Sequence, residues 1–484
     1  MTNYITFDDV LLRPGYSEVL PAAVNIISNI GGQALNVPIL SAAMDTVTES
    51  KLAIAIAHEG GLGVIHKNMS IAEQVAEVVR VKNYEHGMVR KPLTVSSNQL
   101  LAEVSALAKK QGFSGMPVVD NGKLVGIITN RDMRFRLNDK VTVAECMTPL
   151  NQLVTVTEGT DISVVENLMY KHRVEKILVI NAKDHLVGMY TVRDILQSQK
   201  KPIANKDTEG QLRVAAAVGV GQDAKDRSQA LIEAGVDLLV VDTAHGHSKG
   251  VIEHVKWLRT NYPKFDIMAG NIATAEAAEA LAAAGANIVK VGIGPGSICT
   301  TRVVAGVGVP QISAISEVAA ALKGKAVSIV ADGGIRYSGD LVKAIAAGAH
   351  AVMLGSVFAG TEESPGTVEL YQGRVYKSYR GMGSVAAMAA VHGSSDRYFQ
   401  SESSADKLVP EGVEGRVAFK GSLANVMHQF IGGLRAGMGY VGAKDISEMH
   451  SKSKFCTITA AGVKEGHVHD VHVTKEAPNY SKDD

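Results

Sequence analysis

The stretch NIVKVGIGPGSICTTR, residues 287–302, decides the fold because a short apolar run stands directly before a glycine-rich loop. An apolar run of this length beside glycine is typical of a parallel strand that is buried on both faces. Residues 287–291 therefore predict such a strand. Seven further runs of this kind occur along the chain, at residues 38–42, 62–65, 214–218, 237–241, 266–270, 327–331 and 350–354.

Alanine-rich stretches that fit helices lie between most of these runs, at residues 226–234, 275–284, 316–322 and 338–347. Eight parallel strands with crossover helices are the count of a (β/α)₈ TIM barrel, which typically takes about 250 residues before insertions. The only wide gap falls between the second and third strands. The sequence therefore predicts an α/β protein in which a TIM barrel is interrupted by one insertion.

The insertion contains an internal repeat. GKLVGIITNRD (residues 122–132) and DHLVGMYTVRD (residues 184–194) align at an offset of 62 residues. Because there are only two copies, a solenoid is excluded, and we expect a tandem pair that packs face to face. We place the first copy at residues 92–148 and the second at 149–200, which leaves residues 1–91 and 201–484 for the barrel.

The composition limits the class of protein. The chain has 484 residues with 49 basic and 49 acidic side chains, so the usual electrostatic basis for a nucleic-acid or membrane-surface partner is missing. Its three cysteines, Cys146, Cys299 and Cys456, lack metal or disulfide spacing, which fits a reducing compartment. No secretory signal is visible, and no apolar run approaches the roughly 18 residues of a membrane span. We expect a cytoplasmic protein without a dedicated nucleic-acid site.

Polar residues and glycines follow each predicted strand, and the carboxyl ends of the strands are where TIM-barrel enzymes carry their active sites. Cys299 lies in the most glycine-rich of these endings. A lone cysteine is usually a small buried hydrophobe, but this loop has no core to fill, so we favour a nucleophile that acts as its thiolate. The endings are residues 41–45, 66–68, 219–221, 242–247, 271, 292–302, 332–336 and 355–356.

Two glycine-bearing endings follow the seventh and eighth strands, where TIM barrels frequently bind phosphate through backbone N–H groups. They are Asp332-Gly333-Gly334 and Gly355-Ser356. Asp332 could accept hydrogen bonds from two ribose hydroxyls or could instead cap the next helix. No GxGxxG motif opens a helix after a strand, so we expect any nucleotide to bind outside a Rossmann domain.

A polar segment at residues 394–414 and a pair of histidines at positions 245 and 247 also stand out in the sequence. Residues 394–414 are polar and have no clear period, which suits a mobile flap over the site. His245 and His247 are close in sequence, but two histidines and one aspartate on a loop do not make a convincing metal site. Dinucleotide contacts or ordinary loop polarity are the better interpretations there.

With these residues in view, the chain resembles the IMP dehydrogenase family over essentially its whole length. The repeats resemble tandem cystathionine-β-synthase (CBS, or Bateman) domains. The matching pieces are FDDVLLRP (7–14), PILSAAMDTVTE (38–49), GLGVIHKNM (61–69), GIGPGSICTTR (292–302), ADGGIR (331–336), RGMGS (380–384) and the Arg397–Tyr398 pair.

The resemblance implies NAD-dependent oxidation of IMP to XMP, the committed step of guanine nucleotide synthesis. The Cys299 thiolate would add to C2 of the base, and hydride would pass to NAD, which leaves a covalent thioimidate. A flap at about residues 385–420 would then close, and water, positioned by Thr301 and the Arg397–Tyr398 pair, would hydrolyse the adduct. Arginine is a poor base because its pKa exceeds about 12, so Arg397 would need to be desolvated or its proton relayed.

The resemblance also implies binding residues. For IMP they are Ser297, Gly334, Gly355, Ser356 and Tyr379 at the phosphate, Asp332 at the ribose, and Gly381, Met382, Gly383 and Glu411 toward the base. For NAD they are Asp242, Asn271, Gly292 and Arg302. For potassium they are the carbonyls of Gly294, Gly296 and Cys299, completed by Glu465, Gly466 and His467 of the partner subunit.

That shared cation site implies a homotetramer and leaves open whether tetramers pair into octamers. ATP or GTP would bind at the CBS pair, with the ribose held by Thr129 and Asp132 or by Thr191 and Asp194.

Three alternatives remain open. A GMP reductase shares the barrel and the cysteine loop, but it normally lacks both the CBS insertion and the Arg–Tyr flap, which this chain has. A non-catalytic nucleotide sensor would use the CBS pair as its working part, and the intact Cys299 loop argues against it. A flavin-dependent barrel oxidoreductase would use the same phosphate position, and an absorption spectrum would reveal its flavin.

Overall fold

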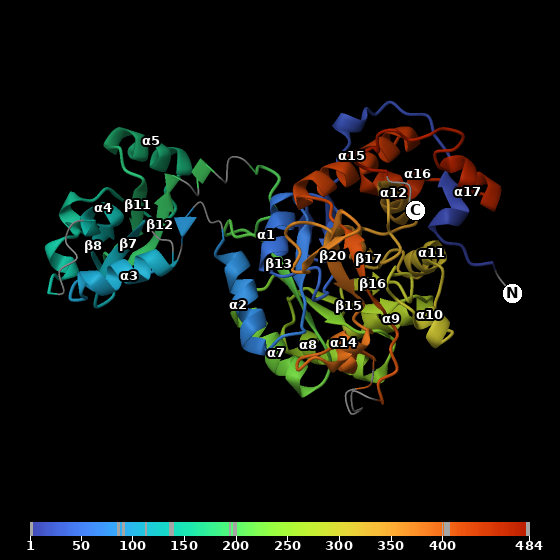
Figure 1. Cartoon of the computed structure of the whole chain (residues 1–484), viewed down its shortest axis with the longest axis horizontal. Coiled ribbons are helices and arrows are strands. Elements are labelled where there is room, and N and C mark those ends of the chain that lie inside the picture. The colour runs from blue at the N-terminus through green and yellow to red at the C-terminus, as the bar shows by residue number, and fades with distance from the viewer. Residues whose placement is uncertain are drawn as a thin grey trace. The chain divides into compact units, whose positions relative to one another are not determined.

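Eight parallel strands form a closed barrel in the computed structural model (Figure 1). Every predicted strand is present with its ends within two residues of those expected, so the predicted TIM barrel is confirmed. In order round the barrel the strands are β13 (Val214–Val218), β14 (Leu238–Asp242), β15 (Ile267–Ile272), β16 (Ile288–Val291), β17 (Ser328–Asp332), β18 (Ala351–Leu354), β4 (Ile39–Ser41) and β5 (Leu62–Ile65).

The structure describes residues 3–84, 88–89, 92–111, 114–134, 140–192, 195–196, 201–398, 400 and 407–480. The chain divides into two compact units. The first comprises Met1–Lys82, Ile203–Lys206 and Leu212–Asp484, and the second comprises Asn83–Pro202 and Asp207–Gln211. No helix within the described residues has the length and apolar character needed to cross a bilayer.

Alternate residues of the strands enter two different apolar clusters. Ala215, Ala217, Leu238 and Val240 belong to a cluster that also contains residues of the hairpin β2 (Ser28–Ile30) and β3 (Gln33–Leu35). Their strand neighbours pack instead with the surrounding helices. This alternation is expected of a barrel whose interior is filled by side chains, so the polar groups of the strands are left to the strand ends.

The helices of the barrel unit surround the strands (Figure 1). Two helices start earlier in the structure than predicted: α7 begins four residues, and α11 five residues, before the predicted start. The first turn of α7, Gln-Asp-Ala-Lys, is polar, and that of α11, Gln-Ile-Ser-Ala, is mixed, so an alanine-rich criterion misses both. The helices are α1 (Ser50–His58), α2 (Ile71–Lys82), α7 (Gln222–Glu233), α8 (Lys249–Asn261), α9 (Ala275–Ala284), α10 (Thr301–Val304), α11 (Gln311–Ala321), α12 (Ser338–Ala346), α13 (Ser356–Ala359), α15 (Leu423–Val441), α16 (Ile446–Lys452) and α17 (Ala460–Gly466).

A small antiparallel sheet stands after the last barrel strand. It consists of β19 (Val368–Tyr371), β20 (Arg374–Arg380) and β21 (Glu414–Ala418). The predicted flap, at about residues 385–420, begins with α14 (Val385–Ala389), continues with the 3-10 turn η5 (Ser395–Tyr398) and includes β21; residues 399 and 401–406 of it lie outside the described residues. Because β20 and β21 pair through Arg380 and Glu414, both ends of that segment are anchored to the same sheet.

The second unit contains two small sheets. β7 (Gly115–Asp120), β8 (Lys123–Thr129) and β9 (Thr148–Pro149) form one, and β10 (Thr155–Thr157), β11 (Lys176–Ile180), β12 (Leu186–Thr191) and β6 (Met88–Val89) form the other. The helices are α3 (Leu101–Gln111), α4 (Asn130–Met133) and α5 (Ile162–His172). Both sheets contribute to one apolar cluster, with Leu124 and Ile127 from the first repeat and Leu178 and Met189 from the second.

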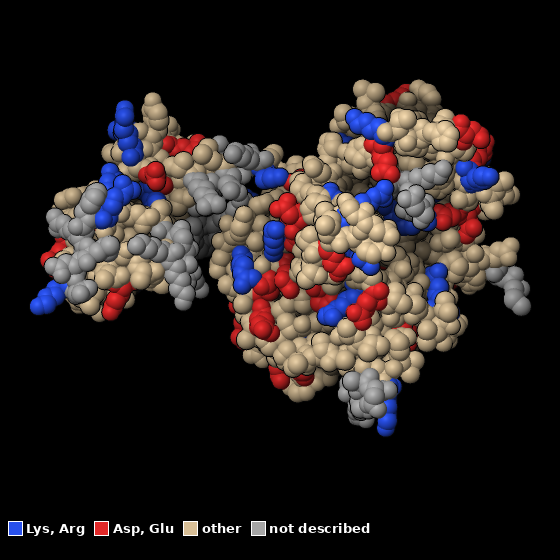
Figure 2. Space-filling model, viewed as in Figure 1, with Lys and Arg blue, Asp and Glu red and all other residues tan. Residues whose placement is uncertain are grey.

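The surface carries both signs of charge. Figure 2 shows Lys and Arg interspersed with Asp and Glu on the viewed face of the barrel unit, without a large field of one sign. This pattern agrees with the balanced composition and gives that face no polyanion-binding stripe.

Candidate active site

A cleft bounded by the carboxyl ends of the barrel strands brings together most of the predicted site residues. It contains about 990 Å³ of space, open solvent included. Among its lining residues are the predicted catalytic set Cys299, Thr301, Arg397 and Tyr398; the predicted substrate set Ser297, Asp332, Gly334, Gly355, Ser356, Tyr379, Gly381, Met382, Gly383 and Glu411; and Asp242, Asn271, Gly292, Gly294 and Gly296.

Cys299 lies on the loop between β16 and α10 and is partly exposed. Its Sγ is 3.1 Å from Oγ1 of Thr301. The loop is fastened on both sides of the cysteine, because Thr300 N donates to the Glu411 carbonyl at 2.9 Å and Val413 N donates to the Ile298 carbonyl at 3.1 Å. The thiol therefore has a fixed backbone while its side chain reaches the cleft.

Lys290, on β16, lies at the centre of a buried charged cluster beneath the cleft and is only 2% exposed. Its Nζ donates to Asp242 Oδ1 at 2.9 Å and to Asp332 Oδ2 at 2.8 Å, and it also contacts Asn271 Oδ1. Asn271 Nδ2 in turn donates to Asp332 Oδ2 at 3.0 Å. The two carboxylates that the sequence assigns to ribose and cofactor are thus held by one ammonium group.

Lys290 is not among the site residues predicted from the sequence. The available signal was a lysine inside an otherwise apolar strand, since lysine is almost never fully buried unless it is paired. That signal predicts a carboxylate partner, but it does not say which one.

Arg397 approaches the same cluster from the flap. Its guanidinium contacts Asp242 Oδ2, and its carbonyl accepts a hydrogen bond from Ala244 N at 3.2 Å. Burial lowers the pKa of Arg397, whereas its interaction with Tyr398 favours the charged form. Arg397 Nε is buried and has no acceptor among the described residues, so a water or substrate atom in the cleft could accept from it.

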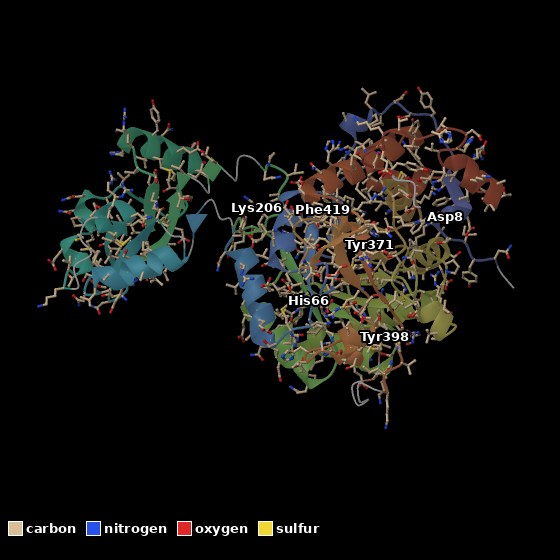
Figure 3. All side chains as sticks on the ribbon, viewed as in Figure 1. Asp8, His66, Lys206, Tyr371, Tyr398 and Phe419 are labelled. Carbon is tan, nitrogen blue, oxygen red and sulfur yellow. The ribbon has the colours of Figure 1, made fainter. Side chains whose placement is uncertain are left out.

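Tyr398, which Figure 3 labels in the barrel unit, packs against the turn that carries the predicted base contacts. A Cβ on Gly383 would lie 2.8 Å from Cζ of the Tyr398 ring, so this approach requires glycine. The Gly383 carbonyl also accepts from Glu411 N at 3.0 Å. Burial raises the pKa of Tyr398, and the neighbouring Arg397 opposes that rise.

The predicted phosphate set gathers hydroxyl and glycine groups without a basic side chain. Tyr379 is buried, and its hydroxyl lies 3.9 Å from Met44 Sδ; burial raises the pKa of its phenol, while the neighbouring Ser297 opposes that rise, so the group stays a hydrogen-bond donor. Its hydroxyl lies 3.1 Å from the position that a Cβ on Gly355 would occupy. Backbone N–H groups and hydroxyls of this kind bind phosphate without a cationic patch.

Four of the predicted residues lie elsewhere in this chain. Arg302 does not line the main cleft; its Nε donates to the Ile293 carbonyl at 3.2 Å, and the side chain borders a smaller pocket beside Asp8. Glu465, Gly466 and His467 are exposed near the end of α17, and His467 Nδ1 lies 3.2 Å from the Tyr480 hydroxyl. Within the described residues, no three His, Cys, Asp or Glu side chains are grouped to hold a metal ion.

The predicted CBS nucleotide residues are only partly described. Asp132 Oδ2 accepts from Thr129 N at 2.8 Å and from Thr129 Oγ1 at 2.6 Å, which forms a capping box at the start of α4. Thr191 ends β12, and Asp194 lies outside the described residues.

In this chain a thiol, hydroxyls and paired carboxylates meet at the carboxyl ends of the strands of a TIM barrel, as they do in enzymes with this fold. Residues 4–469 match the family described as IMP dehydrogenase / GMP reductase domain. The inosine-5'-monophosphate dehydrogenases of Haemophilus influenzae and of Escherichia coli K12 are 57% and 56% identical to this chain, each over 98% of both chains. The chain belongs to the IMP dehydrogenase / GMP reductase family.

A solved structure shows the same fold. It is a cysteine-to-alanine variant of GMP reductase from Trypanosoma brucei in complex with guanosine 5'-monophosphate, and it matches with 39% identity and a TM-score of 0.88. The match covers 98% of this chain and 99% of that chain, so it cannot leave out a segment as long as the insertion. The expectation that a GMP reductase lacks the insertion is wrong for this relative, and the insertion does not separate the two activities.

Proposed function

We propose that this chain oxidises IMP to XMP with NAD as hydride acceptor, through a covalent bond between Cys299 and C2 of the base. The observation that carries the proposal is the cleft itself, in which Cys299 faces the same space as the phosphate set and Asp332. Relatives named inosine-5'-monophosphate dehydrogenase at 54–57% identity favour this activity over reduction of GMP.

In the first step the chain positions IMP against the thiol. The hydroxyls of Ser297 and Tyr379 bind the phosphate, and the carboxylate of Asp332, oriented by Lys290, binds the ribose. The Sγ–C2 bond forms as the C2–H bond breaks, and the two electrons of that bond leave as hydride. NAD, when bound in this cleft, supplies the acceptor for that hydride. The covalent product is a thioimidate on Cys299.

In the second step water adds to C2 and gives up a proton through the Arg397–Tyr398 pair, while the Sγ–C2 bond breaks and Cys299 leaves as its thiolate. Thr301 and the Arg397–Tyr398 pair position that water. Asp242 is assigned to NAD, yet its Oδ2 contacts Arg397 in this structure, so Arg397 and NAD compete for the same carboxylate. The arrangement described here therefore suits hydrolysis, and the free N–H at Arg397 Nε is available to the water.

A monovalent cation fits the cysteine loop. No described residue donates a hydrogen bond to the carbonyl oxygens of Gly294 and Cys299, whereas the Gly296 carbonyl accepts from Cys299 N at 3.1 Å. Uncharged backbone carbonyls coordinate potassium in proteins. Glu465, Gly466 and His467 of the partner subunit complete the site. Because each cation is then shared between two subunits, the enzyme assembles as a homotetramer. Its place is the cytoplasm.

The test is an assay of NADH formation from IMP with and without potassium, beside a GMP-plus-NADPH reaction. We expect NADH formation that depends on IMP and is stimulated by potassium, with no oxidation of NADPH by GMP. NADPH oxidation in the control, without NADH formation from IMP, would instead assign the chain to GMP reductase.

Replacing Arg397 with alanine is expected to slow hydrolysis by at least about 100-fold while hydride transfer continues. The reason is that Arg397 contacts the water of the second step and takes no part in the first. Rapid mixing should show a burst of NADH equal to the active sites, followed by a slow steady state. Loss of the burst would place Arg397 in the first step.

The second unit is a tandem CBS pair that binds ATP or GTP and regulates the barrel. We expect deletion of residues 92–200 to leave the turnover number within about threefold of the full chain, because every residue that lines the cleft belongs to the barrel unit. Any response to ATP or GTP should disappear. A folded but inactive deletion variant would contradict this modular arrangement.

A further inference from the structure

Two strand endings singled out in the sequence have no part in the chemistry above. They are residues 66–68, after β5, and residues 219–221, after β13. Neither Lys67 nor Gly219 is among the described residues that line the cleft. Both of them instead contact Asp396, the residue immediately before Arg397.

Lys67 and Gly219 form a closely fitted site, named the socket, for the carboxylate of Asp396. Lys67 Nζ donates to both carboxylate oxygens of Asp396, at 2.6 and 2.8 Å. A Cβ on Gly219 would lie 2.8 Å from Asp396 Oδ2, so only glycine leaves room for this carboxylate. The Lys67 side chain is 12% exposed and that of Asp396 is 38% exposed.

Asp396 is the charged group that stabilises the ammonium form of Lys67. Burial lowers the pKa of Lys67, and the nearby guanidiniums of Arg397 and Arg227 lower it further. Asp396 acts in the opposite direction, through its charge and its hydrogen bonds. Removing the Asp396 charge would leave a largely buried ammonium between two other cations, which is unfavourable.

The socket fixes the backbone that presents Arg397. η5 is held at Asp396 by the end of β5, while the Arg397 carbonyl and guanidinium contact Ala244 and Asp242 at the end of β14. β5, β13 and β14 are consecutive strands of the barrel. The turn is therefore anchored across three neighbouring strand ends, and the Lys67–Asp396 pair is the anchor that lies outside the cleft.

We infer that Lys67 and Asp396 form a latch that holds η5 on the barrel, which makes Lys67 a positioning residue for Arg397 in the hydrolytic step. The inference rests on the proposed function in one respect, namely that Arg397 and NAD compete for Asp242. Weakening the latch lowers the population in which Arg397 occupies Asp242, so hydrolysis slows and NAD binds more tightly.

Asp396→Asn tests the latch because it removes the charge and keeps the shape. We expect hydrolysis to slow by about three- to tenfold, the KM for NAD to fall by a similar factor, and the NADH burst to remain. The matched control is Asp226→Asn, which removes an exposed carboxylate from α7. It should change neither the rate of hydrolysis nor the KM for NAD. Lys67→Met removes the other partner of the pair and should give the same changes as Asp396→Asn.

A readout that does not depend on turnover is hydrogen exchange in the ligand-free protein. The Ala244 amide donates to the Arg397 carbonyl, so a peptide that contains Ala244 should exchange faster in both Asp396→Asn and Lys67→Met. Unchanged exchange in these two variants would overturn the latch. Faster exchange in a protein that does not oxidise IMP would support the latch and count against the proposed function alone.

Discussion

Replacing Cys299 with alanine is expected to abolish NADH formation from IMP, with a loss of at least about 1,000-fold, because Cys299 is the only thiol among the described residues that line the cleft. IMP binding should stay within about threefold of the wild type, since the phosphate and ribose contacts come from other residues. Calorimetric titration with IMP and the NADH assay measure the two effects separately.

Cys456→Ala is the matched control for that variant. Cys456 is also a partly exposed free thiol, but it lies on β22 (Phe455–Thr457), with its Sγ 3.5 Å from the Leu11 carbonyl. Its replacement should leave the turnover number unchanged. If Cys299→Ala kept wild-type activity, the assignment of Cys299 as the nucleophile would be wrong.

The barrel could be predicted because each strand is marked by local sequence. A strand buried on both faces must be a short apolar run, as at residues 214–218, and the glycines beside it mark its ends. Parallel strands also place all their carboxyl ends on one face, so residues as distant as Asn271 and Gly355 could be assigned to one cleft before any coordinates.

The contacts between distant polar residues could not be predicted in the same way. Lys67 and Asp396 are 329 residues apart, and neither lies in a pattern that names its partner. Lys290 has three polar partners from three different strands. A single sequence does not show which residues of those strands lie side by side. Periodicity reports which face of an element is buried, whereas ion pairing depends on where loops from separate strands meet.

Asp242 links these two sets of contacts. One of its oxygens receives Lys290 and the other receives Arg397, so the buried group of Asp242, Asp332, Lys290 and Arg397 is electrically neutral when η5 is in place. Without Arg397 the remaining three groups carry one net negative charge, which is costly to bury. The charge balance therefore favours Arg397 at Asp242 when no other group occupies this carboxylate.

Lys290→Met should accordingly have the largest effect on stability, together with a loss of substrate affinity. The variant keeps the length of the side chain but leaves two buried carboxylates close together without their shared ammonium group. Removing one partner of a buried ion pair typically costs about 3–5 kcal/mol, and the contacts that Asn271 and Arg397 retain place this case near 3 kcal/mol. Urea unfolding of the ligand-free protein measures the free energy of unfolding.

Lys377→Met separates the cluster's role in binding from ordinary burial of a lysine. Lys377 is 3% exposed and donates to the carbonyls of Thr361 and Ser364 at 3.0 and 2.5 Å, with no carboxylate of the cleft among these partners. Its replacement should destabilise the fold while the dissociation constant for IMP stays within about twofold. In Lys290→Met that constant should rise by at least about tenfold, because Asp332 loses the group that orients it. Equal IMP affinity in the two variants would show that Lys290 serves the fold alone.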